Sequence, residues 1–557
     1  MNNKKIRVAI LQLQARTFSE QAENREHILK FIEKAARLNP DLIVLPECIY
    51  PCYFLSPRII PNYNVLGNLC EHFLEKVKGC ACKFQTFIAL SLPEYIFEKK
   101  ILYNTAVLIG DDGVEIGRTR KSFLWHFDNN WFEPGSHYPV FDTKIGKIGM
   151  FVCADGRQPE IARALSLQGA EILLDLTNLV TTGLERKNWT NAQADYIIPT
   201  RALENKVWIV LANKVGFEES SIQCCGKSAF FSPEGETVLM ASSDREEILF
   251  REIDLSLSHQ KSISGKIDVF QNRRPEMYSY LTLPTGELPI SKEFKKEIGK
   301  EIENPFAAVI QLGESPETEF SAYRSKIEYF FHTLEEQEVN VLSFSQPSST
   351  IPARKNQDIL GLLKKLTKGT AQLCSIVLEE EENGGKYKTI FLVQSGNIIG
   401  KYRKTHLEFQ EKDNIIPGED GFPVFETRFG NIGMLLDYEG FFPEIARILT
   451  LKGADIIIWT CKFSHDEHLK ICRTRSAENK VFIICPNSIG EGYNGHSVIT
   501  SPAGQIIAGC LENEEIASAA IIPVRLARDK MIVPYTNAIL GRQPESYHLL
   551  TSEQTQF

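Results

Sequence analysis

The 557-residue sequence has no apolar run long enough to cross a membrane. Its longest runs, at residues 207–212 and 454–460, are strand-sized, whereas a span needs roughly 20 apolar residues. The beginning of the chain also lacks the long apolar stretch and small-residue cleavage site of a secretory signal. We therefore expect neither a membrane protein nor a secreted one.

Signals for nucleic acid, nucleotides and disulfides are also scarce. The net charge is −9, and no cluster of lysine and arginine with interleaved aromatic residues indicates nucleic-acid binding. A glycine-rich phosphate loop is missing, which disfavours an ATP-using synthetase. The 13 cysteines are odd in number and irregularly spaced, so reduced thiols and a cytoplasmic location are expected. No cofactor and no metal site is predicted.

One cysteine stands at a predicted turn. Cys153 ends the apolar run that follows Lys147, and a helix beginning at Pro159 comes soon after. At such a turn a thiol can project from the sheet, and unpaired N–H groups at the start of a helix favour the nucleophilic thiolate. A cysteine after an apolar run can also be a small buried hydrophobic residue. The motif alone leaves both interpretations open.

Two other segments add a glutamate and a lysine. Glu47 ends the apolar segment 41–47, where a buried carboxylate must be hydrogen-bonded, paired or used in chemistry. Lys121 stands beside the apolar stretch that starts at Phe123. Taken singly, each residue is typical of solvated surface charge. Their order and spacing relative to Cys153 make the set informative.

The three motifs together resemble the nitrilase superfamily of carbon–nitrogen hydrolases. They are strand-Pro-Glu at Glu47, Arg-Lys at Lys121 and Gly-Met-x-x-Cys at Cys153, and the resemblance covers essentially the whole chain, twice. Short strands alternating with amphipathic helices indicate an α/β fold. The resemblance specifies two tandem α-β-β-α sandwiches.

The resemblance also implies catalytic roles. Cys153 would be the nucleophile and Glu47 the general base, which takes the thiol proton and later activates water. Lys121 would stabilise the tetrahedral oxyanion together with the backbone N–H of Ala154. Many members carry a second glutamate at the position of Asp128, and the shorter aspartate is a departure. Its role is left open between positioning Lys121 or the substrate and being a solvated loop residue.

Arg157, four residues after the nucleophile, is a candidate for substrate binding. A guanidinium group fits a carboxylate in a bidentate way. Related enzymes that act on N-carbamoyl amino acids use an arginine near this position, but arginine is also common here in amidases with other substrates. Both interpretations are kept.

The second copy has changed its chemistry. Lys404 and Glu411 occupy the positions of Lys121 and Asp128, but Asp437 replaces the nucleophile. At the position of the first acid the sequence offers Phe344 or Gln346, depending on the register. We expect Lys404, Glu411 and Asp437 to form a buried ion cluster that fixes geometry.

These observations predict a catalytic domain at residues 1–290 and a degenerate domain at 303–557, joined by a charged linker. The predicted function is hydrolysis of a small amide or N-carbamoyl compound through a cysteine thioester, with release of ammonia. The alternatives are a nitrile hydrolase and an inactive binding or scaffold protein. The expected partner is a small-molecule substrate. The two copies are expected to pair with each other within one chain as a pseudo-dimer, and further homo-oligomerisation is left open.

Overall fold

The structure, a computed structural model, describes residues 4–60, 62–181, 185, 189–291, 303–313, 320–347, 353–490 and 492–553. Its contacts divide the chain into two compact units. Unit 1 contains residues 1–261 and 533–557, and unit 2 contains residues 262–532. None of the helices in the described ranges is both long and apolar enough to cross a membrane.

Unit 1 contains two sheets that pack on each other. The first has the order β11-β10-β1-β2-β3-β4-β5, with β14 also paired to β1, and the second has the order β13-β12-β9-β8-β7-β6. The strands of the first sheet are β1 (Lys5–Gln14), β2 (Leu42–Val44), β3 (Phe87–Ile96), β4 (Ile101–Ile109), β5 (Glu115–Arg120), β10 (Lys214–Glu218), β11 (Ile222–Cys225) and β14 (Glu247–Asp254). Those of the second are β6 (Val140–Thr143), β7 (Gly146–Val152), β8 (Ile172–Leu176), β9 (Trp208–Ala212), β12 (Ala229–Phe231) and β13 (Thr237–Met240).

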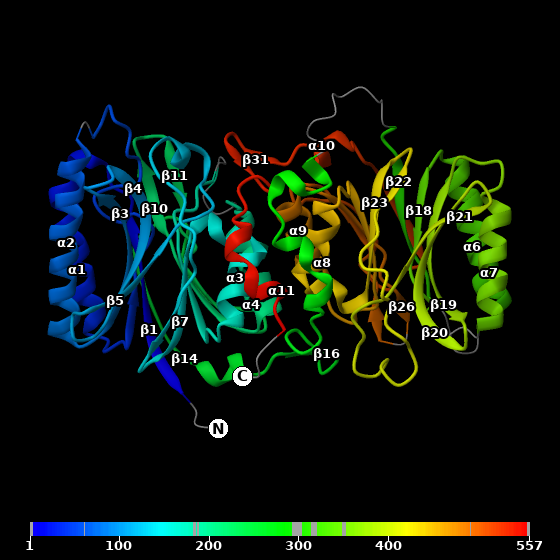
Figure 1. Ribbon diagram of the computed structural model, residues 1–557, viewed down its shortest axis with the longest axis horizontal. Helices are drawn as coiled ribbons and strands as arrows, with labels where there is room; N and C mark the ends of the chain where they lie inside the picture. Colours follow the sequence, from blue (N-terminus) through cyan, green and yellow to red (C-terminus); the bar gives the residue numbers. More distant parts are fainter. Residues whose placement is uncertain are drawn as a thin grey trace. The chain divides into compact units, whose positions relative to one another are not determined.

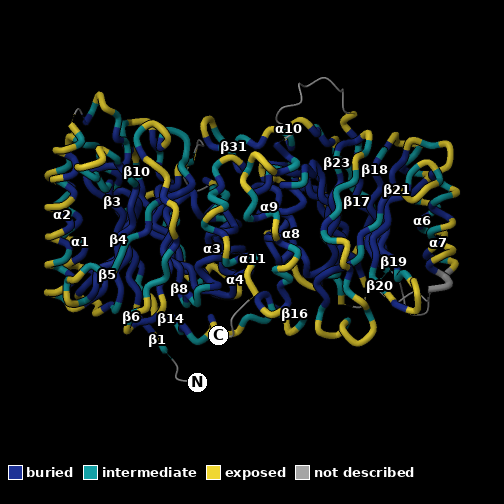
Figure 2. The backbone as a smooth tube through the Cα atoms, viewed as in Figure 1, coloured by how far each residue is buried: buried dark blue, intermediate teal, exposed yellow. Residues whose placement is uncertain are grey.

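Helices cover the outer face of each sheet in unit 1 (Figure 1). On the first sheet lie α1 (Gln21–Ala36) and α2 (Tyr63–Phe84); on the second lie α3 (Pro159–Leu167) and α4 (Ile198–Asn205). Helix α1 buries Ile28, Ile32 and Ala35, whose spacing of three to four residues places them on one helix face. Figure 2 shows this division, with exposed positions along the outer faces of α1 and α2 and buried strands behind them. The predicted α-β-β-α sandwich is confirmed.

Unit 2 repeats the sandwich. Its sheets have the orders β21-β20-β19-β18-β17-β30 and β22-β23-β24-β25-β28-β29. The strands of the first are β17 (Phe306–Gln311), β18 (Val341–Phe344), β19 (Leu373–Glu382), β20 (Gly385–Gln394), β21 (Asn397–Arg403) and β30 (Ile516–Ile521). Those of the second are β22 (Phe425–Thr427), β23 (Gly430–Leu436), β24 (Ile456–Thr460), β25 (Phe482–Cys485), β28 (Val498–Thr500) and β29 (Ile506–Gly509). The main helices are α6 (Phe320–Glu336), α7 (Ala353–Leu366), α8 (Pro443–Leu451) and α9 (Glu467–Asn479).

The last segment of each sequence copy belongs to the unit formed by the other copy. In unit 1, Arg542 from the end of the chain forms a buried ion pair with Glu160 of α3, with Nε 3.3 Å from Oε1. In unit 2, Arg273 forms the matching pair with Glu444 of α8, at 3.1 Å. The predicted domains follow the two sequence copies, whereas the compact units exchange these terminal segments. Most of the predicted linker, residues 292–302, lies outside the described residues.

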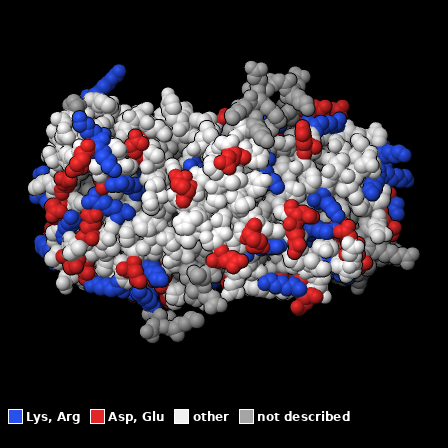
Figure 3. Space-filling view, viewed as in Figure 1, with Lys and Arg blue, Asp and Glu red and all other residues white. Residues whose placement is uncertain are grey.

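One face of the molecule shows mixed charge. On the face drawn in Figure 3, basic and acidic side chains are interspersed over both units rather than gathered into a stripe of one sign.

Candidate active site

Cys153 directly follows β7, at the start of a 3₁₀ turn formed by residues Cys153–Arg157. Its φ of 51° lies in the left-handed region, which residues other than glycine rarely adopt. Asp155 holds the turn, because its Oδ2 accepts from the backbone N–H of Val152 at 3.0 Å and its Oδ1 from that of Phe123 at 2.8 Å. The Asp155 carboxylate therefore ties the cysteine turn to the segment that follows Lys121.

Lys121 lies at the centre of a fully buried group of charges. Its Nζ donates to Glu47 Oε1 at 2.8 Å and to Asp128 Oδ2 at 2.6 Å. Burial alone would lower the pKa of Lys121, but the adjacent Asp128 and Glu47 carboxylates outweigh it and raise this pKa well above its usual range. Lys121 is therefore a permanent cation in the site.

The two oxygens of Glu47 differ. Oε1 accepts from Lys121 and from the Asn104 side chain, at 2.8 and 2.7 Å. Oε2 is buried and makes no hydrogen bond to any residue that the structure describes. Leaving a buried carboxylate oxygen without a hydrogen-bond partner costs free energy. Glu47 Oε2 is therefore available to accept a proton from a thiol or a hydrogen bond from a substrate.

Burial and the Glu47 charge raise the pKa of the Cys153 thiol, and Lys121 opposes them. The thiol is therefore protonated at rest, next to an ionised cluster. Formation of the thiolate requires a base, and Glu47 is the carboxylate that influences this thiol most strongly.

Asp128 is buried within the cluster rather than solvated on a loop. Its Oδ1 accepts from the Tyr53 hydroxyl at 2.8 Å, and its Oδ2 accepts from Lys121 and from the backbone of Trp125. Although aspartate is shorter than glutamate, the short helix at residues 126–130 brings its carboxylate within hydrogen-bonding distance of Lys121.

Arg157 lies on the same turn as the thiol. Its guanidinium carbon is 4.8 Å from the centre of the Trp125 ring, and its Nε donates to Gln193 Oε1 at 3.2 Å. Gln193 in turn donates to the backbone carbonyl of Cys153 at 2.8 Å. The two terminal nitrogens of Arg157 make no hydrogen bond within the described part of the chain, so they are available to an anionic group.

Sequence reasoning missed three side chains of this site, Tyr53, Asn104 and Gln193. Asn104 carried a usable signal, because it is a polar residue in the middle of the buried strand β4. Tyr53 lies in a segment without a strand-end or helix-start pattern. Gln193 begins a short helix (Gln193–Ile197) that Asn191 caps, but its contacts with Arg157 and Cys153 arise only from the tertiary fold.

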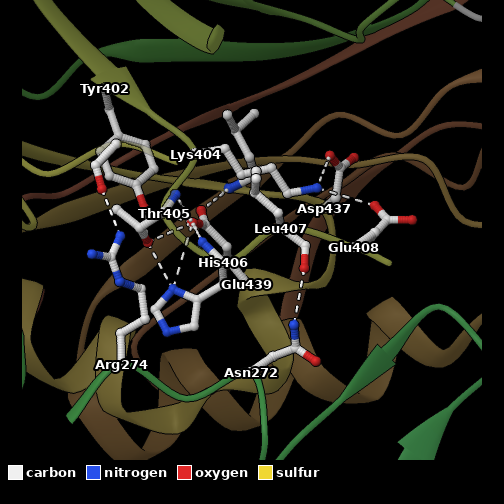
Figure 4. Close-up of polar contacts among 12 residues, drawn as sticks. Asn272, Arg274, Tyr402, Lys404, Thr405, His406, Leu407, Glu408, Asp437 and Glu439 are labelled. Carbon is white, nitrogen blue, oxygen red and sulfur yellow. Dashed lines mark hydrogen bonds and ion pairs between the residues drawn. The ribbon is translucent and has the colours of Figure 1, made fainter. Parts of the chain in front are cut away.

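In unit 2 the equivalent positions form the expected ion cluster, and Figure 4 shows its Lys404 beside Asp437 and Glu408. Lys404 Nζ contacts Glu411 at 2.6 Å and Asp437 at 3.0 Å, as predicted. Lys388 on β20 adds a second cation, 2.5 Å from Asp437. Burial would raise the pKa of Asp437, but the two lysines lower it strongly.

Strand pairing decides the position of the first acid in unit 2. Val8 pairs with Leu42 in unit 1, and Ala307 pairs with Val341 in unit 2. If the two pairs are equivalent, Val341 corresponds to Leu42, and the residue five positions after it, Gln346, corresponds to Glu47. Gln346 Nε2 donates to Asp437 Oδ1 at 2.5 Å. Phe344 instead packs in the hydrophobic core of unit 2.

Unit 1 thus combines a cysteine at a strand-to-helix turn with a buried glutamate–lysine–aspartate cluster on an α-β-β-α sandwich, which defines a cysteine-dependent hydrolase of carbon–nitrogen bonds. The carbon–nitrogen hydrolase family model matches residues 7–261 and 307–530. The chain therefore belongs to the carbon–nitrogen hydrolase family, the nitrilase superfamily, as a tandem duplication.

Relatives match one copy at a time. A nitrilase of Pyrococcus abyssi is 34% identical over 280 residues, which are 49% of this chain and 99% of the relative. The human omega-amidase NIT2 is 28% identical over 286 residues, 49% of this chain and 96% of the relative. Among solved structures, an amidase from Nesterenkonia sp. has a TM-score of 0.43 at 22% identity and covers 50% of this chain and 97% of its own.

Proposed function

We propose that unit 1 hydrolyses the amide bond of a small carboxamide through a thioester on Cys153, with release of ammonia. The observation that carries this proposal is the buried Glu47, whose Oε1 is held by Lys121 and Asn104 while its Oε2 is left without a partner in the described structure. That arrangement suits a general base beside a protonated thiol. The similarity to proteins named omega-amidases supports the amide as the substrate group.

In the first half of the reaction, Glu47 Oε2 takes the proton from the sulfur as the thiolate attacks the amide carbon. The carbonyl oxygen becomes an oxyanion, stabilised by Lys121 Nζ and the backbone N–H of Ala154. When the C–N bond breaks, the proton on Glu47 passes to the leaving nitrogen, which departs as ammonia. The acyl group remains on the sulfur as a thioester.

In the second half, Glu47 takes a proton from a water molecule, whose oxygen attacks the thioester. The same two donors stabilise the new oxyanion. The C–S bond breaks, the sulfur recovers the proton from Glu47, and a carboxylic acid leaves. Lys121 stays charged throughout because Asp128 remains paired with it.

Arg157 gives the site a preference for substrates with a carboxylate remote from the amide. Its terminal nitrogens have no partner among the described residues, and its stacking on Trp125 and its bond to Gln193 hold the guanidinium group in place. A bidentate contact with a carboxylate contributes about 1.5–3 kcal/mol. Arg157 is therefore a substrate-binding residue in this proposal.

The test is ammonia release from four compounds: succinamate, its uncharged analogue butyramide, N-carbamoyl-β-alanine and the nitrile that corresponds to succinamate. We expect succinamate to be the best substrate and the Cys153→Ala variant to be inactive on all four. Arg157→Ala should lower kcat/KM for succinamate roughly ten- to a hundredfold, mainly through KM, and leave butyramide unchanged. Arg58→Ala, at an exposed arginine, is the control.

Other outcomes identify a different function. A higher rate on the carbamoyl compound or the nitrile would move the activity to those substrate classes. If Cys153→Ala released ammonia at the wild-type rate, the nucleophile would be wrong. If all four compounds were inert, unit 1 would be a binding or scaffold module.

A further inference from the structure

Unit 2 contains a cavity of about 380 Å³ at the positions that correspond to the active site of unit 1. It lies between the end of β18, strands β19 and β20, and the loop around residues 410–415. Gln346, Lys388 and Glu411, which line it, all belong to or touch the ion cluster described above. Val377, Leu378 and Ile415 supply apolar wall.

The charged side chains that line this cavity are Glu379, Lys386, Lys388, Glu411 and Lys462. Lys386 pairs with Glu379 at 3.1 Å, and Lys388 pairs with two carboxylates of the cluster. Lys388 Nζ is 2.5 Å from Asp437 Oδ2 and 3.2 Å from Glu411 Oε1. Glu408, Glu411 and Asp437 lie close enough together to share a cation, but Lys404 already contacts all three. A lysine ammonium therefore occupies the place that a metal ion would take.

The cluster still presents hydrogen-bonding capacity to the cavity. Lys388 has three N–H groups and donates two of them, to Asp437 and Glu411. Among the described residues, Glu411 Oε1 accepts from Lys388 alone, so a second lone pair is available. The side-chain oxygen of Gln346 makes no hydrogen bond to a described residue. A donor and an acceptor thus lie side by side, 3.2 Å apart.

This pair matches a primary carboxamide. The amide oxygen would accept from Lys388, one amide N–H would donate to Glu411, and the other N–H would face the Gln346 oxygen. A carboxylate in the same place would lie against Glu411 and Asp437, and an ammonium group would lie against Lys388, so either ion is repelled by one member of the pair. The apolar wall suits a short aliphatic chain.

We propose that the cavity of unit 2 binds a small uncharged primary carboxamide and leaves it intact. Hydrolysis does not follow because Asp437 replaces the thiol and Gln346 replaces the general base. This inference concerns a different site from the proposed function and does not depend on catalysis in unit 1.

Trp459 makes the cavity of unit 2 observable in the full-length protein. It is the single tryptophan within residues 262–532, and its indole N–H donates to the backbone carbonyl of Asp437 at 2.8 Å. A full-length Cys153→Ala protein labelled with 5-fluorotryptophan gives a fluorine resonance for Trp459, which Trp459→Phe assigns. Shifts of the other tryptophans report on unit 1, so binding to the two units is distinguished.

The probes are valeramide, valerate and N,N-dimethylvaleramide. We expect valeramide to shift the Trp459 resonance saturably, and the other two compounds to need at least tenfold higher concentrations. Lys388→Met and Glu411→Gln should each raise the half-saturating valeramide concentration at least tenfold. Ile415→Phe should do the same by filling the cavity while leaving the ion cluster intact. Lys365→Met, at an exposed lysine of α7, should have no effect.

Three results would overturn the proposal. They are an absent Trp459 shift, an equal response to valerate or the dimethyl amide, and a valeramide response that survives Ile415→Phe. If Lys388→Met or Glu411→Gln fails to fold, the Ile415→Phe protein still decides the question, because its substitution does not touch a charged group.

Discussion

Asp128 provides a sharp test of the site, because its carboxylate contacts Lys121, the Tyr53 hydroxyl and the backbone of Trp125, which substitutions can remove one at a time. Asp128→Asn keeps the shape of the side chain but removes the negative charge beside Lys121. Among the described residues, Lys121 then has Glu47 as its one carboxylate partner. The stronger pull of Lys121 on Glu47 makes that carboxylate a weaker base. A hydrogen bond to a charged group contributes about 1.5–3 kcal/mol, so kcat should fall roughly ten- to a hundredfold.

Tyr53→Phe is the matched control for this prediction. It removes the hydroxyl that donates to Asp128 Oδ1 and leaves the ion pair with Lys121 intact, so the loss should be smaller, less than about tenfold. Asp128→Glu, which keeps the charge, should retain more activity than Asp128→Asn. Glu411 shows that a glutamate at the equivalent position can contact its lysine.

Two assays apply to these variants. Ammonia release on the best substrate gives kcat and KM, and the rate of Cys153 alkylation by iodoacetamide, read by peptide mass spectrometry, reports on the thiol without any assumption about the substrate. The reasoning is refuted if folded Asp128→Asn stays within about threefold of wild type in both assays, because Lys121 would then not need the second carboxylate.

Three further predictions concern unit 2 and the end of the chain. Asp437→Cys alone should create no second active site, since Gln346 is not a base; ammonia release above background in a Cys153→Ala, Asp437→Cys protein would contradict this. A chain that ends at residue 532 lacks Thr536, which bonds to the backbone of Leu124 and His126 beside Asp128, and should lose most activity compared with a chain ending at Glu553. Burial lowers the pKa of Lys530 to about 7, so in the native protein it loses its proton near pH 7 while the unfolded chain stays protonated up to its ordinary pKa. The free energy of unfolding of the wild type therefore decreases as the pH falls from the ordinary lysine pKa to about 7. Because Lys530→Met has no such group, urea unfolding should show its free energy of unfolding rising by about 2–3 kcal/mol relative to that of the wild type when the pH is lowered from 9 to 7. A difference between the two proteins that does not change with pH would refute the lowered pKa.

Strand-end signals explain why part of the site could be predicted from the sequence. Glu47, Lys121 and Cys153 each end or adjoin an apolar run, and their order matched a known family. Asn104 stands out as a polar residue within the buried strand β4, but Tyr53 has no such signal. The contacts of both could not be predicted, because they depend on how β4 and the segment after Glu47 pack around Lys121. The choice between Phe344 and Gln346 needed the strand register, because the two positions are two residues apart and the alternation of side chains along a strand does not distinguish them.

The exchanged terminal segments could not be predicted either. Each copy reads as self-contained in the sequence, and nothing local indicates that residues 533–557 join unit 1 while residues 262–291 join unit 2. The two matched ion pairs, Arg542 with Glu160 and Arg273 with Glu444, show the physical reason. Each arginine is buried and needs a buried carboxylate, and α3 and α8 each supply one.

The differences between the two sites form a consistent set when their charges are compared. In unit 1, Glu47 and Asp128 surround Lys121, which leaves one net negative charge beside a neutral thiol. In unit 2, Asp437 in place of that thiol would bury another negative charge, and Lys388 in place of Asn104 supplies the positive charge that balances it.

Gln346 in place of Glu47 removes one carboxylate from unit 2, and Glu408 beside Lys404 adds one. Three carboxylates and two lysines again leave one net negative charge. Because an unpaired buried charge costs several kcal/mol, these positions depend on one another. Lys388→Asn alone, which restores the residue type of unit 1, should therefore destabilise unit 2 rather than return it toward catalysis. The loss of the thiol in the second copy is accordingly part of a rebuilt polar site and not an isolated substitution.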